Sequence, residues 1–358
     1  MRIDKLDGLR GFCSLMVVLY HYPQSFLPDF IFSNSFIRES WSFVDFFFVL
    51  SGFVISYNYS TLSSSNDFWM YIKKRFIRLY PLLLFTTIVF FLFKLLSDNF
   101  FADLVNSPKG IKLYLIDCLN TLLMLNSTPA FGEMSKYLGM NHPSWSVSAE
   151  FISYVLFGLT SLFFFNKKQL YLLVVTGLCI VVYVIKEQYV ASNYTWFFLR
   201  GIIGFNMGCV VYWAYNKKFS VKNNLELTLP FLIVVVFHVF HNYEFSFKEP
   251  LNLIFKPLLF SFIILVLLKT NHYFSKFLES KPLKFLGKIS YSIYLNHILL
   301  LLALPRITFN FFGLHQSSYT ELLVLLLTIV VVILYSTLTF TYIESSFART
   351  LKKRLNEQ

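Results

Sequence analysis

The chain has 358 residues, of which 56% are hydrophobic and only 14% are charged, and its formal net charge is +12. A soluble domain of this length could not keep so much apolar surface away from water, so the composition excludes an ordinary soluble protein. The positive charge would suit nucleic acid in a soluble protein, but its placement between apolar runs makes a nucleic-acid partner unnecessary.

Runs of about 17 to 25 mostly apolar residues predict membrane-spanning helices, because only helices and closed barrels pair every backbone polar group in lipid. Ten such runs occur, at 7–23, 43–60, 79–96, 147–165, 169–185, 194–215, 227–241, 251–268, 289–304 and 321–343. They predict an all-α, polytopic membrane protein. The run 111–125 is too short to span comfortably. It is expected to form a re-entrant or interfacial helix inside the largest loop, 97–146.

The distribution of Lys and Arg predicts the orientation of these helices. With the N-terminus inside, twenty-one of the 31 basic residues fall in inside segments and only seven fall outside. The positive-inside rule then places both termini in the cytoplasm and the chain in the inner (plasma) membrane, among membrane lipids. We expect one transmembrane domain over residues 1–358, with no soluble domain. The four cysteines have no metal-site spacing, so neither a zinc site nor a disulfide framework is expected.

The first predicted helix carries two ionisable residues on one face. Arg10 and His21 are eleven residues apart, which is about 20° from three full turns and roughly 16 Å along the axis. Ser14 lies between them on the same face. Such residues in a membrane helix are functional candidates, although a snorkelling arginine and an interfacial histidine would also explain the pattern.

Two arginines follow the second predicted span. Arg75 and Arg78 are three residues apart in the basic segment 73–81, so on a helix they are neighbours. Two guanidinium groups on one face suit a phosphate, because each can donate two parallel hydrogen bonds. Contact with anionic lipid headgroups is the alternative interpretation.

Three further segments contain polar residues at predicted membrane edges. In the segment from Trp145 to Glu150, the carboxylate follows an indole and the hydroxyl of Ser148. Glu150 could therefore hold a sugar, orient His21, or cap the helix N-terminus, where the helix dipole favours a carboxylate. Asp45 opens the second span and is expected near His21.

The segment 287–297 is the third of them. Ser290, Tyr294 and His297 share a helical face there. We consider Tyr291 and His297 as candidate substrate-binding residues, together with Trp145 and Ser148.

Six segments, in this order, resemble the acyltransferase 3 family of integral membrane proteins. They are Gly8-Leu9-Arg10 to His21, Phe47 to Phe53, Arg75 with Arg78 and Pro81, Trp145 to Glu150, Gly287 to His297, and Ile343 to Ser346. The last segment departs from the family pattern, because Ser346 stands where proline is usual. The resemblance covers about residues 4–348, and since the chain ends at Gln358 it resembles the stand-alone form without a fused esterase-like domain.

This resemblance implies transfer of an acyl group, commonly acetyl from acetyl-CoA, onto a hydroxyl of an extracytoplasmic acceptor. The acceptors would be carbohydrates or lipid-linked glycans, such as O-antigen, capsule or exopolysaccharide, and no metal is expected. The resemblance also implies that His21 is catalytic, that Arg10 is needed, and that Arg75 and Arg78 help to bind the donor.

The residues themselves suggest a compatible mechanism. His21 is the best base for an attacking hydroxyl, and Asp45 or Glu150 could orient it, as a third group does in hydrolase triads. Direct transfer and an acyl-histidine intermediate both remain open.

The donor would approach from the cytoplasmic side. Its phosphates would bind Arg75 and Arg78, and its pantetheine arm would run beside Arg10 and Ser14. The acceptor would arrive from outside. A secondary transporter of a sugar or lipid-linked intermediate is the alternative function, and the missing internal repeat counts against it.

Overall fold

The computed structural model describes residues 3–100, 110–131, 139–189, 196–243 and 248–356, and this part of the chain contains helices but no strand. The α-helices are α1 (Asp4–His21), α2 (Asp29–Phe32), α3 (Ser35–Arg38), α4 (Phe43–Asn58), α5 (Ser65–Phe100), α6 (Ile111–Leu122), α7 (Ser144–Phe163), α8 (Lys168–Tyr189), α9 (Phe197–Tyr215), α10 (Leu229–Asn242), α11 (Lys248–Lys269), α12 (Tyr273–Leu278), α13 (Lys281–Arg306), α14 (Ser318–Thr339) and α15 (Ser345–Asn356). The predicted all-α class is therefore confirmed.

The ten predicted spans all correspond to helices, although residues 194–195 of the sixth lie outside the described residues. Across the described ranges, nine helical segments are long and apolar enough to cross a membrane. The first predicted span, α1, is not among them. Its first half carries Asp4, Lys5, Asp7 and Arg10, which lower its hydropathy. The prediction of about ten crossing helices is thus confirmed for nine.

Two helices are longer than the apolar pattern predicts. The third predicted span, 79–96, is the central part of α5, which starts at Ser65 and so includes Arg75 and Arg78. The short run 289–304 lies within α13, which has 26 residues. The run 111–125 contains the helix α6, while residues 101–109 and 132–138 of the predicted loop 97–146 lie outside the described residues.

The helices that carry the candidate residues pack at backbone contact. A Cβ atom added to Gly8 would lie 1.8 Å from the backbone oxygen of Leu278, and one added to Gly287 would lie 1.9 Å from that of Asp7. A Cβ on Gly52 would lie 1.8 Å from the backbone oxygen of Phe205. Glycine therefore allows α1 to approach α12 and α13 closely, and α4 to approach α9 in the same way.

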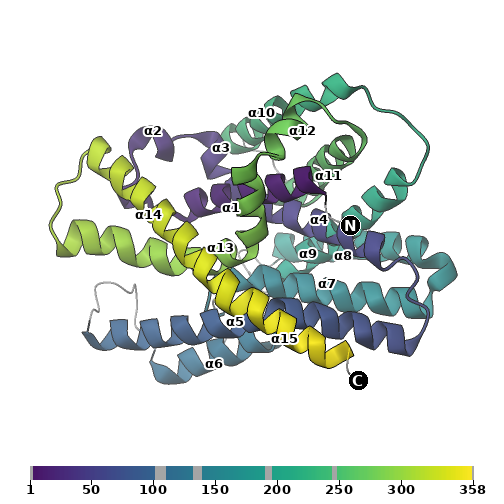
Figure 1. The fold of residues 1–358 in the computed structure, drawn as a ribbon, viewed down its shortest axis with the longest axis horizontal. Helices are drawn as coiled ribbons and strands as arrows, with labels where there is room; N and C mark the ends of the chain where they lie inside the picture. The colour runs from purple at the N-terminus through teal and green to yellow at the C-terminus, as the bar shows by residue number, and fades with distance from the viewer. Residues whose placement is uncertain (1–2, 101–109, 132–138, 190–195, 244–247, 357–358) are drawn as a thin grey trace.

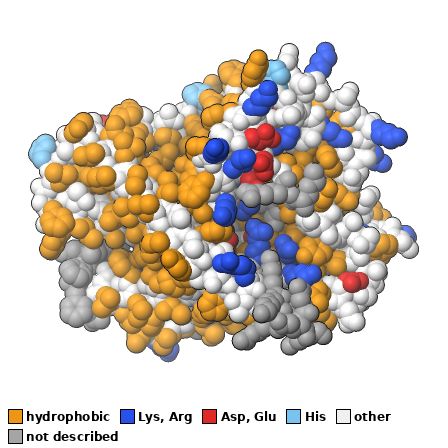
Figure 2. Space-filling model, in the orientation of Figure 1, with side chains coloured by type: hydrophobic (Ala, Val, Ile, Leu, Met, Phe, Trp, Pro, Cys, Tyr) orange, Lys and Arg blue, Asp and Glu red, His pale blue; other side chains and the backbone are white. Residues whose placement is uncertain are grey.

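The ends of the described chain lie at the same end of the helix bundle, where α1 begins and α15 finishes (Figure 1). Lys and Arg side chains gather on the half of the visible face towards this end, whereas the opposite half is mostly hydrophobic (Figure 2). Exposed leucines such as Leu326 and Leu334 of α14 belong to the apolar surface. Together with the nine apolar helical segments of the described chain, a surface of this kind fits a lipid environment.

Candidate active site

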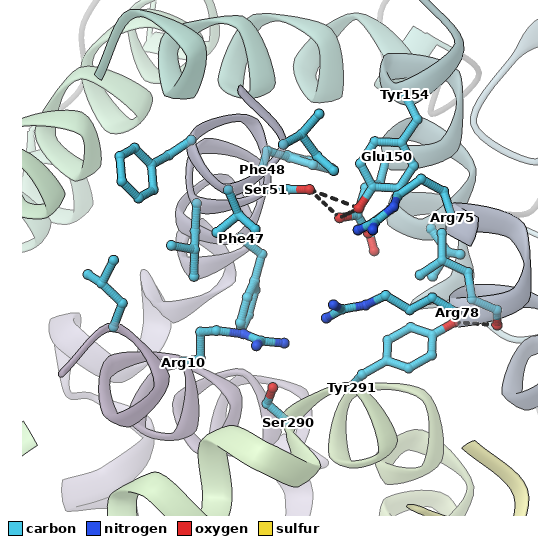
Figure 3. Close-up of a pocket in the computed structure, with 18 of the residues that line it drawn as sticks. Arg10, Phe47, Phe48, Ser51, Arg75, Arg78, Glu150, Tyr154, Ser290 and Tyr291 are labelled. Carbon is cyan, nitrogen blue, oxygen red and sulfur yellow. Dashed lines mark hydrogen bonds between the residues drawn. The ribbon is translucent and has the colours of Figure 1, made fainter. Parts of the chain in front are cut away.

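A cavity of about 260 Å³ lies among α1, α4, α5, α7 and α13. Three guanidinium groups line it: Arg10 comes from α1, and Arg75 and Arg78 come from consecutive turns of α5 (Figure 3). Because α5 is helical through both arginines, their three-residue spacing places them side by side. The fold thus brings together cations that lie more than sixty residues apart in the sequence.

The arginine side chains have few direct partners. Arg10 Nη1 lies 3.6 Å from Asp7 Oδ1. Arg75 Nη2 donates a hydrogen bond of 3.0 Å to the Tyr59 hydroxyl, but its Nε is buried and has no hydrogen-bond partner within the described chain. Arg78 is exposed and points into the cavity (Figure 3). Since an unpaired buried N–H is costly, this arrangement favours an anion such as a phosphate.

A carboxylate forms another wall of the same cavity. Ser51 Oγ donates a 2.6 Å hydrogen bond to Glu150 Oε1, and the hydroxyl of Tyr154, one turn along α7, donates to the same oxygen (Figure 3). Glu150 thus lies in the cavity wall. Of the three roles considered for it, this position is compatible with binding a substrate. Gly52 allows close packing against α9, whereas its neighbour Ser51 fixes the carboxylate.

The two candidate histidines face each other across α1 and α13. His297 Nε2 lies 3.2 Å from His21 Nδ1, and the ring centroids are 5.0 Å apart. His297 is fully buried, whereas His21 is partly exposed at the last residue of α1. The residue that orients His21 from a neighbouring helix is therefore His297, in place of the expected carboxylate.

Backbone carbonyls determine how these rings carry their protons. His21 Nδ1 is 3.0 Å from the Val17 oxygen, and His297 Nδ1 is 3.2 Å from the Ile293 oxygen. A carbonyl only accepts, so we assign the proton to Nδ1 in both neutral rings. The single Nδ1–H of His21 is then shared between the Val17 oxygen and His297 Nε2, and His21 Nε2 keeps its lone pair. A base oriented through its other nitrogen is the arrangement needed for general-base catalysis.

Tyr294 links the arginine cavity to the histidine pair. It lines the cavity, its ring centroid lies 5.9 Å from that of His297, and its hydroxyl oxygen lies 2.8 Å from Ser146 Oγ. Phe47, on α4, faces it with a centroid distance of 6.2 Å. The histidines thus lie just beyond the aromatic end of the cavity, one turn further along α13.

Asp45 lies elsewhere than expected. Its carboxylate accepts two hydrogen bonds from Arg200, of 2.7 Å from Nε and 2.9 Å from Nη2, and both side chains are buried. The guanidinium also stacks over Trp41, with 4.6 Å between Arg200 Cζ and the ring centroid. This bidentate pair joins α4 to α9, so the expectation that Asp45 orients His21 is replaced by a structural role.

Three other candidates are packed away from the cavity. Ser14 is 1% exposed and donates to the Gly11 carbonyl oxygen, so it does not border the expected donor path. Trp145 packs on Phe197, and Ser148 Oγ donates to the Met124 oxygen. Tyr291 does line the cavity, although its hydroxyl donates to the Leu79 oxygen.

Sequence reasoning missed Tyr154 and His142 and undervalued Ser51. Tyr154 follows Glu150 by four residues, and this helical spacing could have linked them. His142 lies in a loop, and its ring centroid is 5.9 Å from that of His21. Nothing in the local sequence pattern indicates that contact, because it depends on how the loop before α7 reaches α1.

Comparison with known proteins shows which family and relatives this chain is similar to. A family model described as an acyltransferase domain matches residues 3–341. O-acetyltransferase OatA of Staphylococcus aureus is 25% identical over 320 residues, which cover 82% of this chain and 49% of the relative. Peptidoglycan O-acetyltransferase OatA of Listeria monocytogenes is 24% identical, with 82% and 49% covered. Acyltransferase MdmB of Streptomyces mycarofaciens is 30% identical over 163 residues, with 44% and 39% covered.

The chain spans about half the length of the OatA relatives that it matches. No solved structure matches it. The family resemblance is confirmed by the match over residues 3–341, which includes five of the six segments and ends before the sixth, Ile343 to Ser346.

Proposed function

Because this chain belongs to the acyltransferase 3 family, we propose that it is a membrane O-acetyltransferase that moves an acetyl group from acetyl-CoA to a hydroxyl of an extracytoplasmic carbohydrate. The observation that carries the proposal is the arginine-lined cavity, whose wall residue Tyr294 lies one helical turn from His297, with His297 Nε2 3.2 Å from Nδ1 of the proposed base His21. The names of the OatA relatives support acetyl as the group, and the Listeria relative's name supports a cell-envelope glycan as the acceptor.

His21 would act as the general base. The acceptor O–H gives its proton to His21 Nε2 while the oxygen forms a bond to the thioester carbonyl carbon. The C–S bond then breaks, and the leaving thiolate takes the proton from His21. His297 holds the ring through Nδ1, as the third group of a triad does.

The donor would be held by its phosphates. Arg75 and Arg78 offer planar forks with five N–H donors each, and Arg10 adds a third cation from the facing helix. The cavity volume suits a narrow pantetheine arm more than a whole nucleotide. The arm would pass Phe47 and Tyr294 to bring its thioester to His21.

The placement in the membrane follows from the charges. The excess of Lys and Arg in the predicted inside segments supports cytoplasmic termini. The nine apolar helical segments of the described chain support a membrane location, which we propose is the plasma membrane. Arg75 and Arg78 would then face cytoplasmic acetyl-CoA, and His21 would lie towards the acceptor. We propose that residues 1–358 form one transmembrane catalytic domain.

Calorimetric titration of the purified protein with acetyl-CoA tests the donor site. We expect wild-type protein to bind and Arg75→Ala/Arg78→Ala to lose at least about tenfold in affinity, because two charge-assisted contacts are removed. Lys73→Ala/Lys74→Ala removes the same charge from the adjacent residues, which do not line the cavity, and should bind like wild type. Equal weakening by both pairs would show that general basicity, and not this cavity, attracts the donor.

A further inference from the structure

We propose that His142 is the acceptor-side positioning residue, which hydrogen-bonds a polar group next to the hydroxyl that His21 activates. This inference rests on the proposed function and adds a residue to it. His142 is exposed, and its ring meets that of His21 at 71°, with 5.9 Å between the centroids. It is not part of the lining of the arginine cavity.

The three histidines have different surroundings. His297 is fully buried and holds His21 through Nδ1, while His142 contacts the ring of His21 and is open to the surroundings. Tyr294 lines the donor cavity and lies beside His297, so His297 is on the donor side of the cluster. A second substrate that approaches His21 from the side of the exposed His142 would contact both rings.

The residues around His142 are held unusually firmly for a loop. Asn141 Nδ2 donates a 2.9 Å hydrogen bond to the Leu295 oxygen, two residues before His297. The backbone N–H of Met140 donates to Thr121 Oγ1 at 2.9 Å, and its oxygen accepts from Lys94 Nζ at 3.2 Å. Helices α5, α6 and α13 thus fix the backbone on the N-terminal side of His142.

On its other side, the chain enters α7 directly. The Ser144 N–H donates to the Asn141 oxygen at 2.9 Å, which closes a turn around His142 and Pro143. An exposed side chain on a backbone fixed from both directions is arranged for contact with a ligand, because its position is set before the ligand arrives. Imidazole can either donate or accept, so it suits a carbohydrate hydroxyl.

The geometry also limits the kind of acceptor. Two imidazoles whose centroids are 5.9 Å apart can contact two adjacent polar groups of one sugar ring, and a simple monohydric alcohol offers only one. The acceptor class is therefore a carbohydrate with a hydroxyl or amide beside the acetylated oxygen. His142 would increase the affinity for it without contacting the donor.

Steady-state kinetics of the purified full chain test this assignment, with acetyl-CoA as donor and an N-acetylglucosamine tetramer as acceptor. We expect His142→Ala and His142→Phe to raise the acceptor KM by about tenfold, the effect of one lost hydrogen bond. The donor KM and the hydrolysis of acetyl-CoA without acceptor should not change. His142→Gln, which keeps a polar side chain, should recover part of the loss. The exposed histidine variant His238→Ala is the control and should match wild type.

Each other result has a definite meaning. An unchanged acceptor KM would overturn the role of His142, and so would a parallel loss of donor binding and hydrolysis, which indicates damage to His21. A wild-type protein that hydrolyses acetyl-CoA but never acetylates the tetramer would overturn the carbohydrate class and this inference with it. A folded wild-type protein that does not consume acetyl-CoA would refute the proposed function itself.

Discussion

His297 Nε2 lies 3.2 Å from His21 Nδ1, and each ring is also held by a carbonyl four residues earlier on its own helix. The pair therefore needs no carboxylate to set the tautomer of the base. Its two members come from segments 276 residues apart, so neither helix alone contains the base and the group that orients it.

The first prediction concerns this pair. His21→Ala should reduce transfer by about a thousandfold or more, because it removes the general base. His297→Ala should reduce kcat by about a hundredfold, because His21 loses the group that fixes its ring. Acetyl-CoA affinity should stay at the wild-type value in both variants when measured by calorimetry. A His297→Ala protein with wild-type kcat would refute the orienting role.

The second prediction separates the charge of Arg78 from its shape. Arg78→Lys keeps the positive charge in the cavity but loses the planar fork, so acetyl-CoA affinity should fall by about tenfold. Arg78→Ala should fall further. Calorimetry at two salt concentrations checks the assignment, since the alanine variant, which removes one of the three cations, should show a weaker salt dependence than the lysine variant. Equal affinity of the lysine variant and the wild type for acetyl-CoA would mean that the site recognises only the positive charge at position 78.

The third prediction follows from the buried pair between Asp45 and Arg200. Asp45→Ala leaves a buried guanidinium without its carboxylate, which costs about 3–5 kcal/mol, so the yield of folded protein should drop. The remaining folded protein should keep its activity per molecule. Asp29→Ala, at an exposed carboxylate, is the control for thermal stability. If the Asp45→Ala protein kept full stability but had a much lower kcat, the result would support the catalytic role that the sequence suggested for Asp45.

The fourth prediction concerns the backbone contact of α1. Gly8→Ala places a methyl group 1.8 Å from the Leu278 oxygen, so the helices must separate at a cost of roughly 1–3 kcal/mol. Thermal unfolding in detergent should show a lower Tm. Gly177→Ala, where nothing lies within 4 Å of the added atom, should be neutral or slightly stabilising. Equal Tm values for the two variants would contradict the close packing.

Hydropathy and helical spacing were enough to locate most helices, because a span must be apolar along its whole length. The first predicted span is helical in α1, but the early charges of α1 keep it out of the nine described helical segments that are apolar enough to cross a membrane. Hydropathy also placed the start of α5 too late, because the first turns of α5 are polar and lie before the apolar run. Periodicity shows which face of a helix is apolar, but it does not show whether the helix continues into polar residues beyond the membrane.

The same distinction applies to the site. Spacing along one helix correctly predicted that Arg75 and Arg78 are neighbours, and the family motifs singled out His21 and His297. The partner of Asp45 could not be predicted from the sequence. Arg200 lies 155 residues away, and any buried carboxylate could accept a hydrogen bond from its guanidinium group. His142 was missed for a related reason, because loop positions follow from tertiary contacts and have no period.

The glycine contacts have a mechanical consequence for the reaction. Gly11 and Gly287 bring the backbones of α1 and α13 together, because a Cβ atom on Gly11 would lie 2.5 Å from the Leu283 oxygen and one on Gly287 would lie 1.9 Å from the Asp7 oxygen. Since α1 carries His21 and α13 carries His297, this close packing joins the two helices that hold the base and its orienting ring. We therefore expect any opening that admits a donor past Tyr294 to involve the other walls of the cavity, α4, α5 and α7.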